Sequence, residues 1–279
     1  MHFTHLQTTP TSTLLHIFNT AFADYYLPFH LTEAQLLAKM RADKNSPALS
    51  VGAFDGDRLV GFILHGVDTV NGQRTVYNGG TGVIPEYRGQ GSTARMYAHA
   101  IPLLKDQGVD RVILEVISQN APAIKSYERS GFKALREVAC FKGEVQLQRY
   151  NDRVEVQELD TLNWQALLPF ADVLPTWQNA THVLDAAQAD LKALGAFLHG
   201  QLVGYLIAHP TNQRLHQIAV HPEHRRQGTG QALLHAWAQK FGHTLSIINV
   251  DKRAQHVTGF LTSVGLEVFI EQVEMELEL

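Results

Sequence analysis

The chain has 279 residues, of which 45% are apolar and 18% are charged, and its net charge is −4. This balance excludes a disordered chain, and the length favours two domains over one core. Residues 1–150 carry 15 Lys and Arg against 13 Asp and Glu, residues 151–279 carry 8 against 14, and neither half has the basic excess that nucleic-acid binding requires.

The cysteine count, the N-terminal pattern and the spacing of the histidines bear on the compartment of the protein and on whether it binds a metal. Cys140 is the single cysteine, which excludes an internal disulfide framework and fits a reducing compartment. The first residues lack the pattern of a signal peptide, and no apolar run approaches the roughly 20 residues of a membrane span. The 15 histidines are scattered, and His221 and His224, only three positions apart, lack a metal-ligand spacing. We therefore expect a cytoplasmic protein with no metal and no membrane contact.

The expected elements of the first half alternate between strands and helices. A mostly helical opening (12–42) is followed by strands at 50–54, 59–67 and 75–84, a helix at 91–107, a strand at 111–117, a helix at 121–130 and a last strand at 132–142. The second half opens with a strand at 154–159 and has a shorter helical section. This order predicts an α/β fold with a mixed (α+β) sheet and helices packed on it. Cys140, on the last of the listed strands, is expected to be a buried apolar residue.

Three segments of the first half recur in the second half in the same order. RLVGFIL (58–64) recurs as QLVGYLI (201–207), VIPEYRGQGST (83–93) as VHPEHRRQGTG (220–230), and SGF (130–132) as VGL (264–266). A Gly-containing turn precedes the first segment in each half, which is typical of a β-hairpin. Three echoes in one order indicate two homologous domains. With a boundary in the polar stretch around 143–153, we expect domains at 1–148 and 149–279.

The second of these segments has the pattern of an anion site. A β-type run ends at Val83 and Ile84, and Gly89 and Gly91 precede a helix-period pattern. Glycines leave backbone N–H groups unshielded and the helix dipole adds its positive end, which suits a phosphate or diphosphate. The segment matches neither a P-loop nor G-x-G-x-x-G. From the residues alone, a strand–turn–helix with incidental glycines explains it equally well.

A carboxylate and a phenol stand out in the stretch VILEVISQNAPAIKSYERSGF (112–132). Glu115 interrupts an apolar strand, where an unpaired buried carboxylate costs several kcal/mol. It therefore either lines an opening or takes part in chemistry, or it faces solvent on an edge strand. Tyr127 lies on an expected helix that Asn120, Ala121 and Pro122 open. This tyrosine is either a reactive group or a half-buried packing residue.

The glycine loop resembles the acetyl-CoA-binding segment of the GNAT (GCN5-related N-acetyltransferase) family, whose signature is Gln/Arg-x-x-Gly-x-Gly/Ala. Residues 88–93 match it until Thr93, where Gly or Ala is usual, and residues 225–230 match it completely. The resemblance implies that acetyl-CoA is the cosubstrate, that the loop binds its pyrophosphate, and that the Val83 N–H polarises the thioester carbonyl. The cofactor-binding residues that it implies are Val83, Arg88, Gly89, Gln90, Gly91, Ser92, Thr93 and Asn120.

The stretch 112–132 is similar to ribosomal-protein alanine acetyltransferase-like members of the same family. The resemblance implies that Glu115 is the general base and that Tyr127 protonates the departing thiolate, with Asn120 at the pantetheine arm. It also places the acceptor pocket at 24–29, where Tyr25 and Tyr26 either line the pocket or belong to the core.

The second copy departs from this pattern at the positions that carry chemistry. An ungapped count back from Gly265, matched to Gly131, replaces Tyr127, Asn120 and Glu115 by Leu261, Ala254 and Asn249. No tyrosine occurs in 206–279. We therefore expect the C-terminal copy to be non-catalytic.

Together these features predict an acetyl-CoA-dependent N-acetyltransferase that moves an acetyl group to a primary amine by direct attack. The acceptor is expected to be a small molecule or a peptide, and the protein a monomer or a homodimer. The tandem arrangement is similar to that of mycothiol synthases, although no motif fixes that substrate. The alternative is a non-catalytic acyl-CoA-binding or regulatory tandem module.

Overall fold

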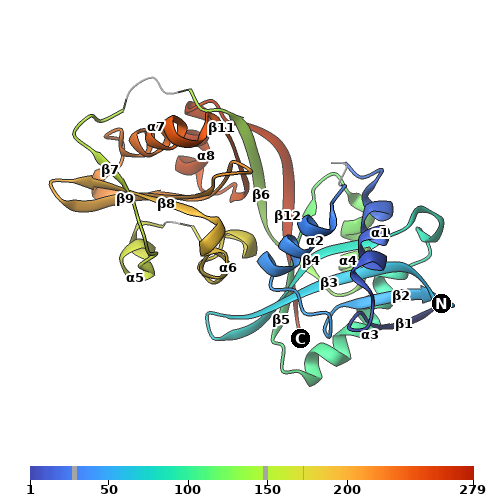
Figure 1. The fold of residues 1–279 in the computed structure, drawn as a ribbon. Coiled ribbons are helices and arrows are strands. Elements are labelled where there is room, and N and C mark those ends of the chain that lie inside the picture. The colour runs from blue at the N-terminus through green and yellow to red at the C-terminus, as the bar shows by residue number, and fades with distance from the viewer. Residues whose placement is uncertain (27–29, 147–149, 172) are drawn as a thin grey trace. The chain divides into compact units, whose positions relative to one another are not determined.

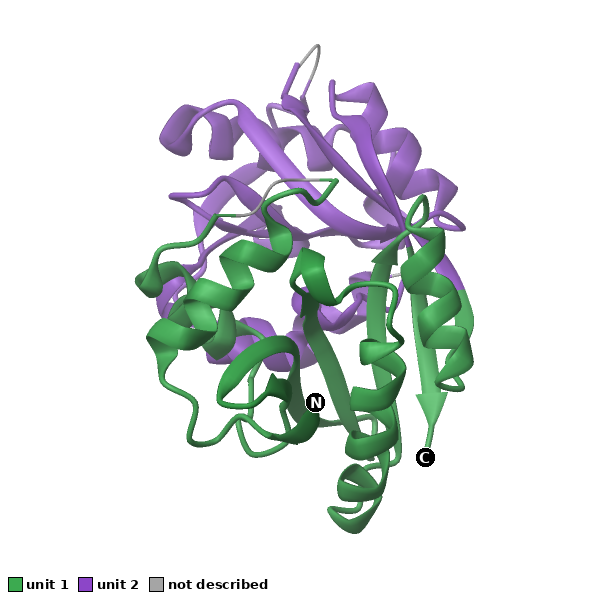
Figure 2. Ribbon diagram, turned by 90° about the vertical axis from the view of Figure 1, so that its right-hand side faces the viewer, with its two compact units in different colours: residues 1–135, 273–279 green, residues 136–272 purple. Residues whose placement is uncertain are grey.

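The chain folds into two compact units, each of which combines strands and helices. The computed structural model describes residues 1–26, 30–146, 150–171 and 173–279. Unit 1 contains residues 1–135 and 273–279, and unit 2 contains residues 136–272 (Figure 2). Each unit has parallel and antiparallel strand pairs in its sheet, so the α/β fold with a mixed sheet is confirmed.

Unit 1 is built on strands in the order β1-β2-β3-β4-β5-β12. Strands β1 to β4 are antiparallel neighbours, and β5 runs parallel to β4. The elements of unit 1 (Figure 1) are β1 (His2–His5), α1 (Thr11–Phe22), α2 (Glu33–Ala42), β2 (Val51–Asp55), β3 (Arg58–Val70), β4 (Gln73–Val83), the 3-10 turn η1 (Pro85–Tyr87), α3 (Ser92–Asp106), β5 (Arg111–Ile117), α4 (Ala121–Arg129) and part of β12 (Glu267–Glu278).

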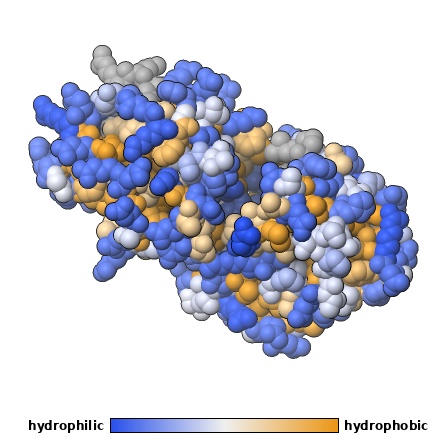
Figure 3. Space-filling view, viewed as in Figure 1, coloured by the Kyte–Doolittle hydropathy of each residue, from blue (hydrophilic) through white to orange (hydrophobic). Residues whose placement is uncertain are grey.

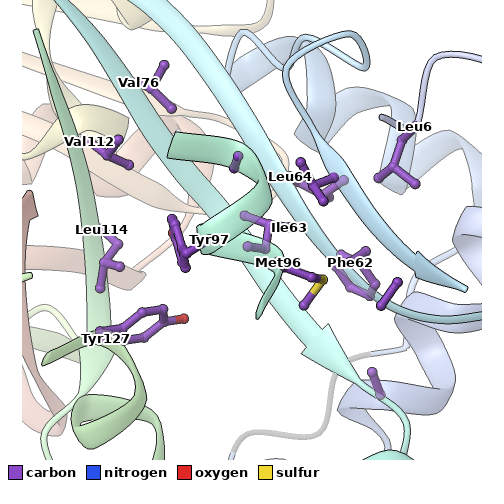
Figure 4. Close-up of a cluster of buried hydrophobic side chains, with 14 of the residues drawn as sticks. Leu6, Phe62, Ile63, Leu64, Val76, Met96, Tyr97, Val112, Leu114 and Tyr127 are labelled. Carbon is purple, nitrogen blue, oxygen red and sulfur yellow. The ribbon is translucent and has the colours of Figure 1, made fainter. Parts of the chain in front are cut away.

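Side-chain alternation on β3 distributes the helices of unit 1 over both faces of its sheet. Phe62 stacks on Phe18 of α1, with ring centroids 5.7 Å apart. The next residue, Ile63, points to the opposite face, where Met96 and Tyr97 of α3 lie (Figure 4). Helices α1 and α3 therefore cover opposite faces of the sheet.

Unit 2 repeats this arrangement with strands in the order β12-β6-β11-β10-β9-β8-β7. Strands β8, β9 and β10 are antiparallel neighbours, and β11 is parallel to β10. The elements of unit 2 are β6 (Lys133–Glu144, from residue 136), β7 (Glu155–Glu158), α5 (Trp164–Leu167), η2 (Leu168–Phe170), η3 (Trp177–Asn179), α6 (Thr181–Ala186), η4 (Gln188–Asp190), β8 (Lys192–Leu198), β9 (Gln201–His209), β10 (Arg214–Val220), η5 (Pro222–His224), α7 (Thr229–Phe241), β11 (Thr244–Asp251), α8 (Gln255–Ser263) and the first part of β12.

The last strand of each sequence repeat is exchanged between the units. Strand β6 ends the first repeat, yet from residue 136 it belongs to unit 2, where it pairs with β11. Strand β12 ends the second repeat, yet Met275 and Leu277 are buried in the core of unit 1. In unit 1 the Leu279 N–H also donates to the Asp110 carbonyl oxygen (2.9 Å). The domains expected at 1–148 and 149–279 follow the sequence repeats, whereas each compact unit contains one exchanged strand.

The surface is predominantly polar where it can be viewed. Figure 3 shows hydrophilic residues over much of the visible face, with smaller hydrophobic patches among them. Within the described ranges, no helix is both long enough and apolar enough to cross a membrane.

Candidate active site

Strands β4 and β5 separate after a short paired stretch. Among the described residues they pair only from Thr75 opposite Arg111 to Tyr77 opposite Ile113. Just beyond, β4 has a bulge, because two residues of β3 oppose three residues at 78–80 of β4. Residues 78–83 of β4 thus pair with β3 on one side and are not paired with β5 on the other. We call that second side the free edge of β4.

The backbone of Val83 points toward this free edge. The next residue, Ile84, donates its N–H to the Val60 carbonyl oxygen on β3 (3.1 Å), and adjacent residues of a strand point their N–H and C=O groups to opposite sides. The Val83 carbonyl oxygen accepts instead from Arg88 Nε (3.0 Å). Because both backbone groups of one strand residue share a direction, the Val83 N–H also faces away from β3.

A glycine loop connects β4 to the start of α3 and leaves its backbone open. Gly91 is the N-cap of α3 with φ 72°, and Gly89 has φ 74°. A Cβ added at either glycine would meet no atom within 4 Å. The first N–H groups of a helix have no intrahelical partner and lie at the positive end of its dipole. This loop can therefore bind an anionic group through its backbone.

The polar side chains of the loop hold its shape. The Arg88 guanidinium bonds both carboxylate oxygens of Asp24 (2.7 and 2.8 Å) and the Ala21 carbonyl oxygen (2.9 Å), and this partner holds the pKa of the Asp24 carboxyl below its usual value. Gln90 Nε2 donates to the Glu86 carbonyl oxygen (3.2 Å). Ser92 Oγ lies 3.4 Å from the Tyr87 carbonyl oxygen, and Thr93 is half-buried in the first turn of α3. Contact with a ligand is left mainly to the loop backbone.

The loop of the second repeat has the same internal bonds. Arg225 Nε donates to the Val220 carbonyl oxygen (2.9 Å), and Gln227 Nε2 donates to the Glu223 carbonyl oxygen (3.1 Å). Thr229 Oγ1 lies 3.4 Å from the His224 carbonyl oxygen. The matching geometry supports the equivalence of the two loops that the sequence indicates.

The second loop, however, is covered by its own chain. A Cβ added at Gly228 would lie 2.8 Å from the Asn151 nitrogen and 3.3 Å from the Tyr150 carbonyl carbon. Strands β10 and β11 also separate, and Asn179 bridges them: its Nδ2 donates to the Ile248 carbonyl oxygen (2.8 Å), and its own carbonyl oxygen accepts from Gln217 Nε2 (2.6 Å). The loop backbone and the gap between the separating strands are thus open in unit 1, whereas residues of the same unit occupy both places in unit 2.

Tyr127 of α4 is buried beside the free edge of β4. Its ring packs at 6.1 Å from the Tyr97 ring and 5.7 Å from the Phe132 ring. Its hydroxyl points away from Leu114 (Figure 4) and lies beside the polar side chains of Thr81 and Asn78. Burial raises the pKa of Tyr127 to about 12, and these two polar neighbours act in the opposite direction. The phenol is therefore protonated at neutral pH.

Glu115 lies on the other face of β5. Its neighbours Leu114 and Val116 are buried in the core that contains Tyr127, so alternation along the strand directs Glu115 away from that core. Glu115 Oε2 accepts a hydrogen bond from the Tyr77 hydroxyl (2.8 Å). The structure thus places the expected acid and base on opposite faces of one strand.

The remaining expected site residues gather at the start of α4. Asn120 is the N-cap of α4: its Oδ1 accepts from the Ala123 N–H (3.2 Å), and its Nδ2 lies 3.5 Å from the Tyr25 hydroxyl. Burial raises the pKa of Tyr25. The Tyr26 hydroxyl donates to the Gln119 carbonyl oxygen (3.1 Å). Residues 27–29 of the expected aromatic cluster lie outside the described residues.

Two other expectations concern cysteine and metals. Cys140 is buried in β6, as predicted. In the described parts of the chain, no three His, Cys, Asp or Glu side chains are grouped so that they could hold a metal ion.

Sequence reasoning missed four residues near the site, namely Tyr77, Asn78, Thr81 and Tyr97. One signal was present, because Asn78 is followed by Gly79 and Gly80 inside an expected strand. Asn and Gly are depleted in strands, and glycine there marks bulges and close approaches.

Each repeat contains two strands that separate and a glycine loop at the start of a helix. The chain is therefore a tandem of two domains with the same fold. The acetyltransferase (GNAT) family model matches residues 13–132 and 155–263. The chain belongs to the GNAT acetyltransferase family.

Relatives share part of the sequence. N-alpha-acetyltransferase 30 of Schizosaccharomyces pombe is 31% identical over 87 residues, which cover 31% of this chain and 58% of that protein. Mycothiol acetyltransferase of Clavibacter michiganensis subsp. michiganensis is 34% identical over 114 residues, which cover 40% of this chain and 36% of that protein. The matches thus span less than two thirds of these relatives.

Solved structures share the whole fold. A tandem GNAT protein from the clavulanic acid biosynthesis pathway has a TM-score of 0.70 at 15% identity, covering 99% of this chain and 98% of its own. A GCN5-related N-acetyltransferase from Sphaerobacter thermophilus has a TM-score of 0.75 at 14% identity, covering 99% and 95%. At such low identity these likenesses concern the fold alone.

Proposed function

We propose that this chain is an acetyl-CoA-dependent N-acetyltransferase that transfers an acetyl group to a primary amine and reacts in unit 1. The observation that carries the proposal is the buried, protonated hydroxyl of Tyr127, which lies beside the free edge of β4. Strand β4 itself leads directly into an open glycine loop. Family membership supports the use of acetyl-CoA. A cytoplasmic location and a monomeric or homodimeric state remain predictions from the sequence.

The loop and the edge of β4 divide the binding between them. Backbone N–H groups around Gly89, Gly91 and the first turn of α3 bind the diphosphate, because no side chain shields them. The Val83 N–H donates to the thioester carbonyl oxygen, where negative charge develops as the amine attacks.

Proton transfer is divided between the two faces of β5. Acetyl-CoA supplies an acetyl group activated as a thioester. Tyr127 donates its phenolic proton to the sulfur as the carbon–sulfur bond breaks, and its pKa of about 12 keeps that proton available at neutral pH. Glu115 accepts a proton from the acceptor ammonium. Because Glu115 points away from Tyr127, we place this deprotonation before the attack.

Unit 2 is proposed to make no turnover of its own. Its loop is covered by Tyr150 and Asn151, and Leu261 stands at the place of Tyr127. The fold therefore persists without an open site, which keeps a non-catalytic acyl-CoA-binding module as the second candidate function for the chain.

The test measures release of free CoA with a panel of peptide N-termini and small-molecule amines. Tyr127→Phe keeps the ring and removes the hydroxyl, so kcat is expected to fall by about 10²–10⁴-fold with little change in acetyl-CoA affinity. Glu115→Gln is expected to remove or shift the acidic limb of the pH–rate profile, and its effect shrinks at high pH, where the amine is already neutral.

A matched control lies in unit 2. Tyr205 is also buried, with its hydroxyl bonded to Gln217 Oε1 (2.9 Å) and a pKa of about 12, and Tyr205→Phe is expected to leave kcat unchanged. Wild-type kcat in Tyr127→Phe, with chemistry rate-limiting, would show that the acid is assigned wrongly. Binding of acetyl-CoA without CoA release for any acceptor would favour the binding module.

A further inference from the structure

The orientation of the Asn78 side chain is fixed by a backbone donor. Its Oδ1 lies 3.0 Å from the Gly80 nitrogen, whose N–H can only donate. The amide nitrogen therefore points the other way, to Thr81 Oγ1 (2.8 Å) and to the Tyr97 hydroxyl oxygen (2.7 Å). Asn78 is buried and makes these three bonds at the bulge of β4. Its position leaves little freedom to rotate.

This arrangement decides which way the Tyr127 proton points. Thr81 accepts from Asn78, so the Thr81 hydroxyl has its own proton available for another acceptor. The Tyr127 hydroxyl lies beside both residues. Because Thr81 and Tyr97 take both amide protons of Asn78, Thr81 is the one of the two that donates to it. A phenol oxygen that accepts from Thr81 directs its own proton away from Thr81, and the bond that Asn78 donates to Thr81 strengthens the bond that Thr81 donates onward. The Tyr127 proton is then directed away from Asn78 and Thr81.

The second repeat shows that the fold does not need this polar cluster. Asn78 directly precedes the bulge of β4, and Leu215 directly precedes the equivalent bulge of β10. At the same offset from the loop, the positions of Asn78, Thr81 and Tyr97 are occupied in the second repeat by Leu215, Ile218 and Leu234. Leu261 stands at the place of Tyr127, the fourth member of the cluster. All four are aliphatic, and the three leucines are fully buried in the core of unit 2. A polar cluster at these positions in unit 1 therefore calls for a chemical reason.

We propose that Asn78 and Thr81 are positioning residues, which orient the Tyr127 hydroxyl so that its proton points to the leaving sulfur, with Tyr97 holding the second N–H of Asn78. This inference rests on the proposed function. As Tyr127 gives up its proton, Thr81 donates to the phenolate oxygen that forms, and Asn78 holds the Thr81 hydroxyl in place. They thus act on the leaving-group step through Tyr127, without contact with the substrate.

The experiment removes each donor and asks whether Tyr127 transmits the effect. Thr81→Val keeps the side-chain shape and Asn78→Leu installs the residue of the second repeat. Each is expected to lower kcat by about 10- to 100-fold, a part of the general-acid contribution, while the Kd for acetyl-CoA changes less than about twofold. Thr81→Ser restores the hydroxyl and is expected to recover most of kcat. In a Tyr127→Phe background, Thr81→Val and Asn78→Leu are expected to cause no further loss.

Each outcome distinguishes this inference from the proposed function. Wild-type kcat in Tyr127→Phe overturns the acid itself. A loss in Tyr127→Phe together with full kcat in Thr81→Val overturns only the positioning role. Equal losses from Thr81→Val in the wild-type and Tyr127→Phe backgrounds also overturn it, because the effect then does not pass through Tyr127. Circular dichroism and the acetyl-CoA Kd confirm that each variant is folded, and Thr81→Val keeps the test decisive if Asn78→Leu does not fold.

Discussion

The two glycine loops provide a matched pair of substitutions with opposite expected effects. Gly91 and Gly228 are both helix N-caps with positive φ, 72° and 82°. A side chain at such φ costs about 1–2 kcal/mol, so valine strains both loops similarly. The difference lies in the space around them. Nothing lies within 4 Å of a Cβ at Gly91, whereas Asn151 lies 2.8 Å from a Cβ at Gly228.

This difference sets the expected magnitudes. In Gly91→Val the side chain projects into the space proposed for the diphosphate, and we expect acetyl-CoA affinity to fall at least about tenfold, or about 1.4 kcal/mol. In Gly228→Val, overpacking against Asn151 adds about 1–3 kcal/mol to the backbone strain. That variant is expected to destabilise unit 2 but to leave acetyl-CoA affinity and kcat within a few-fold.

Calorimetric titration with acetyl-CoA and urea unfolding of both variants provide the measurement. One site per wild-type chain is expected, because the second loop is covered. Unchanged affinity in folded Gly91→Val would refute binding at the first loop. A stoichiometry of two, or a greater loss of affinity in Gly228→Val than in Gly91→Val, would refute the reasoning about the covered loop.

Three further predictions concern stability. Met275→Ala is expected to cost about 2–5 kcal/mol and to reduce hydrogen-exchange protection in β3–β5 more than in β8–β9, because Met275 is buried in the core of unit 1; equal losses in both sets of strands would contradict this. Burial lowers the pKa of His65 to about 4. As the pH falls, the unfolded chain binds a proton on this histidine below about pH 6.5, whereas the folded chain binds it only near pH 4, so stability decreases over that window. His65→Phe is expected to flatten urea-unfolding free energies there by up to about 3 kcal/mol, and an unchanged pH slope would count against the assignment. Hydrogen bonds from Arg253, opposed by burial and assisted by Arg136, lower the pKa of Asp251 to about 2; its contribution is present above about pH 4 and is lost as the pH falls toward 2, so Asp251→Asn should cost about 2 kcal/mol at pH 7 and less at pH 3.

The sequence predicted the elements around the candidate site well because their signals are local. The β-branched run of β5 is bounded by turns, and its predicted range, 111–117, is the observed one. The start of α3 follows from Gly91 and that of α4 from Pro122. The helical opening proved to be two helices, with Thr32 and Gln35 forming a capping box at the second. Strand β1, four residues long, is too short for a periodic pattern to indicate it.

Features that depend on distant contacts could not be predicted. Strands β6 and β12 end homologous repeats and have similar patterns, so nothing in either pattern states which one lies beside β5. The cluster of Asn78, Thr81, Tyr97 and Tyr127 brings together residues up to 49 positions apart in sequence and depends on a bulge. The stretch before β7 is polar, as a linker should be, and its contact with Gly228 follows only from the packing of unit 2.

The exchanged strands also constrain how the protein is synthesised. Residues 136–272 leave the ribosome between the two parts of unit 1, so β5 lacks its neighbour until residues 273–279 have been made. An apolar strand with an unsatisfied edge is prone to wrong pairing during that interval. In a fragment that stops at residue 148, the edge of β5 that pairs with β12 stays unpaired. Within that fragment, β6 is the strand that corresponds to β12 in the sequence repeat. Production of the first repeat alone therefore removes part of the very unit that it is meant to isolate.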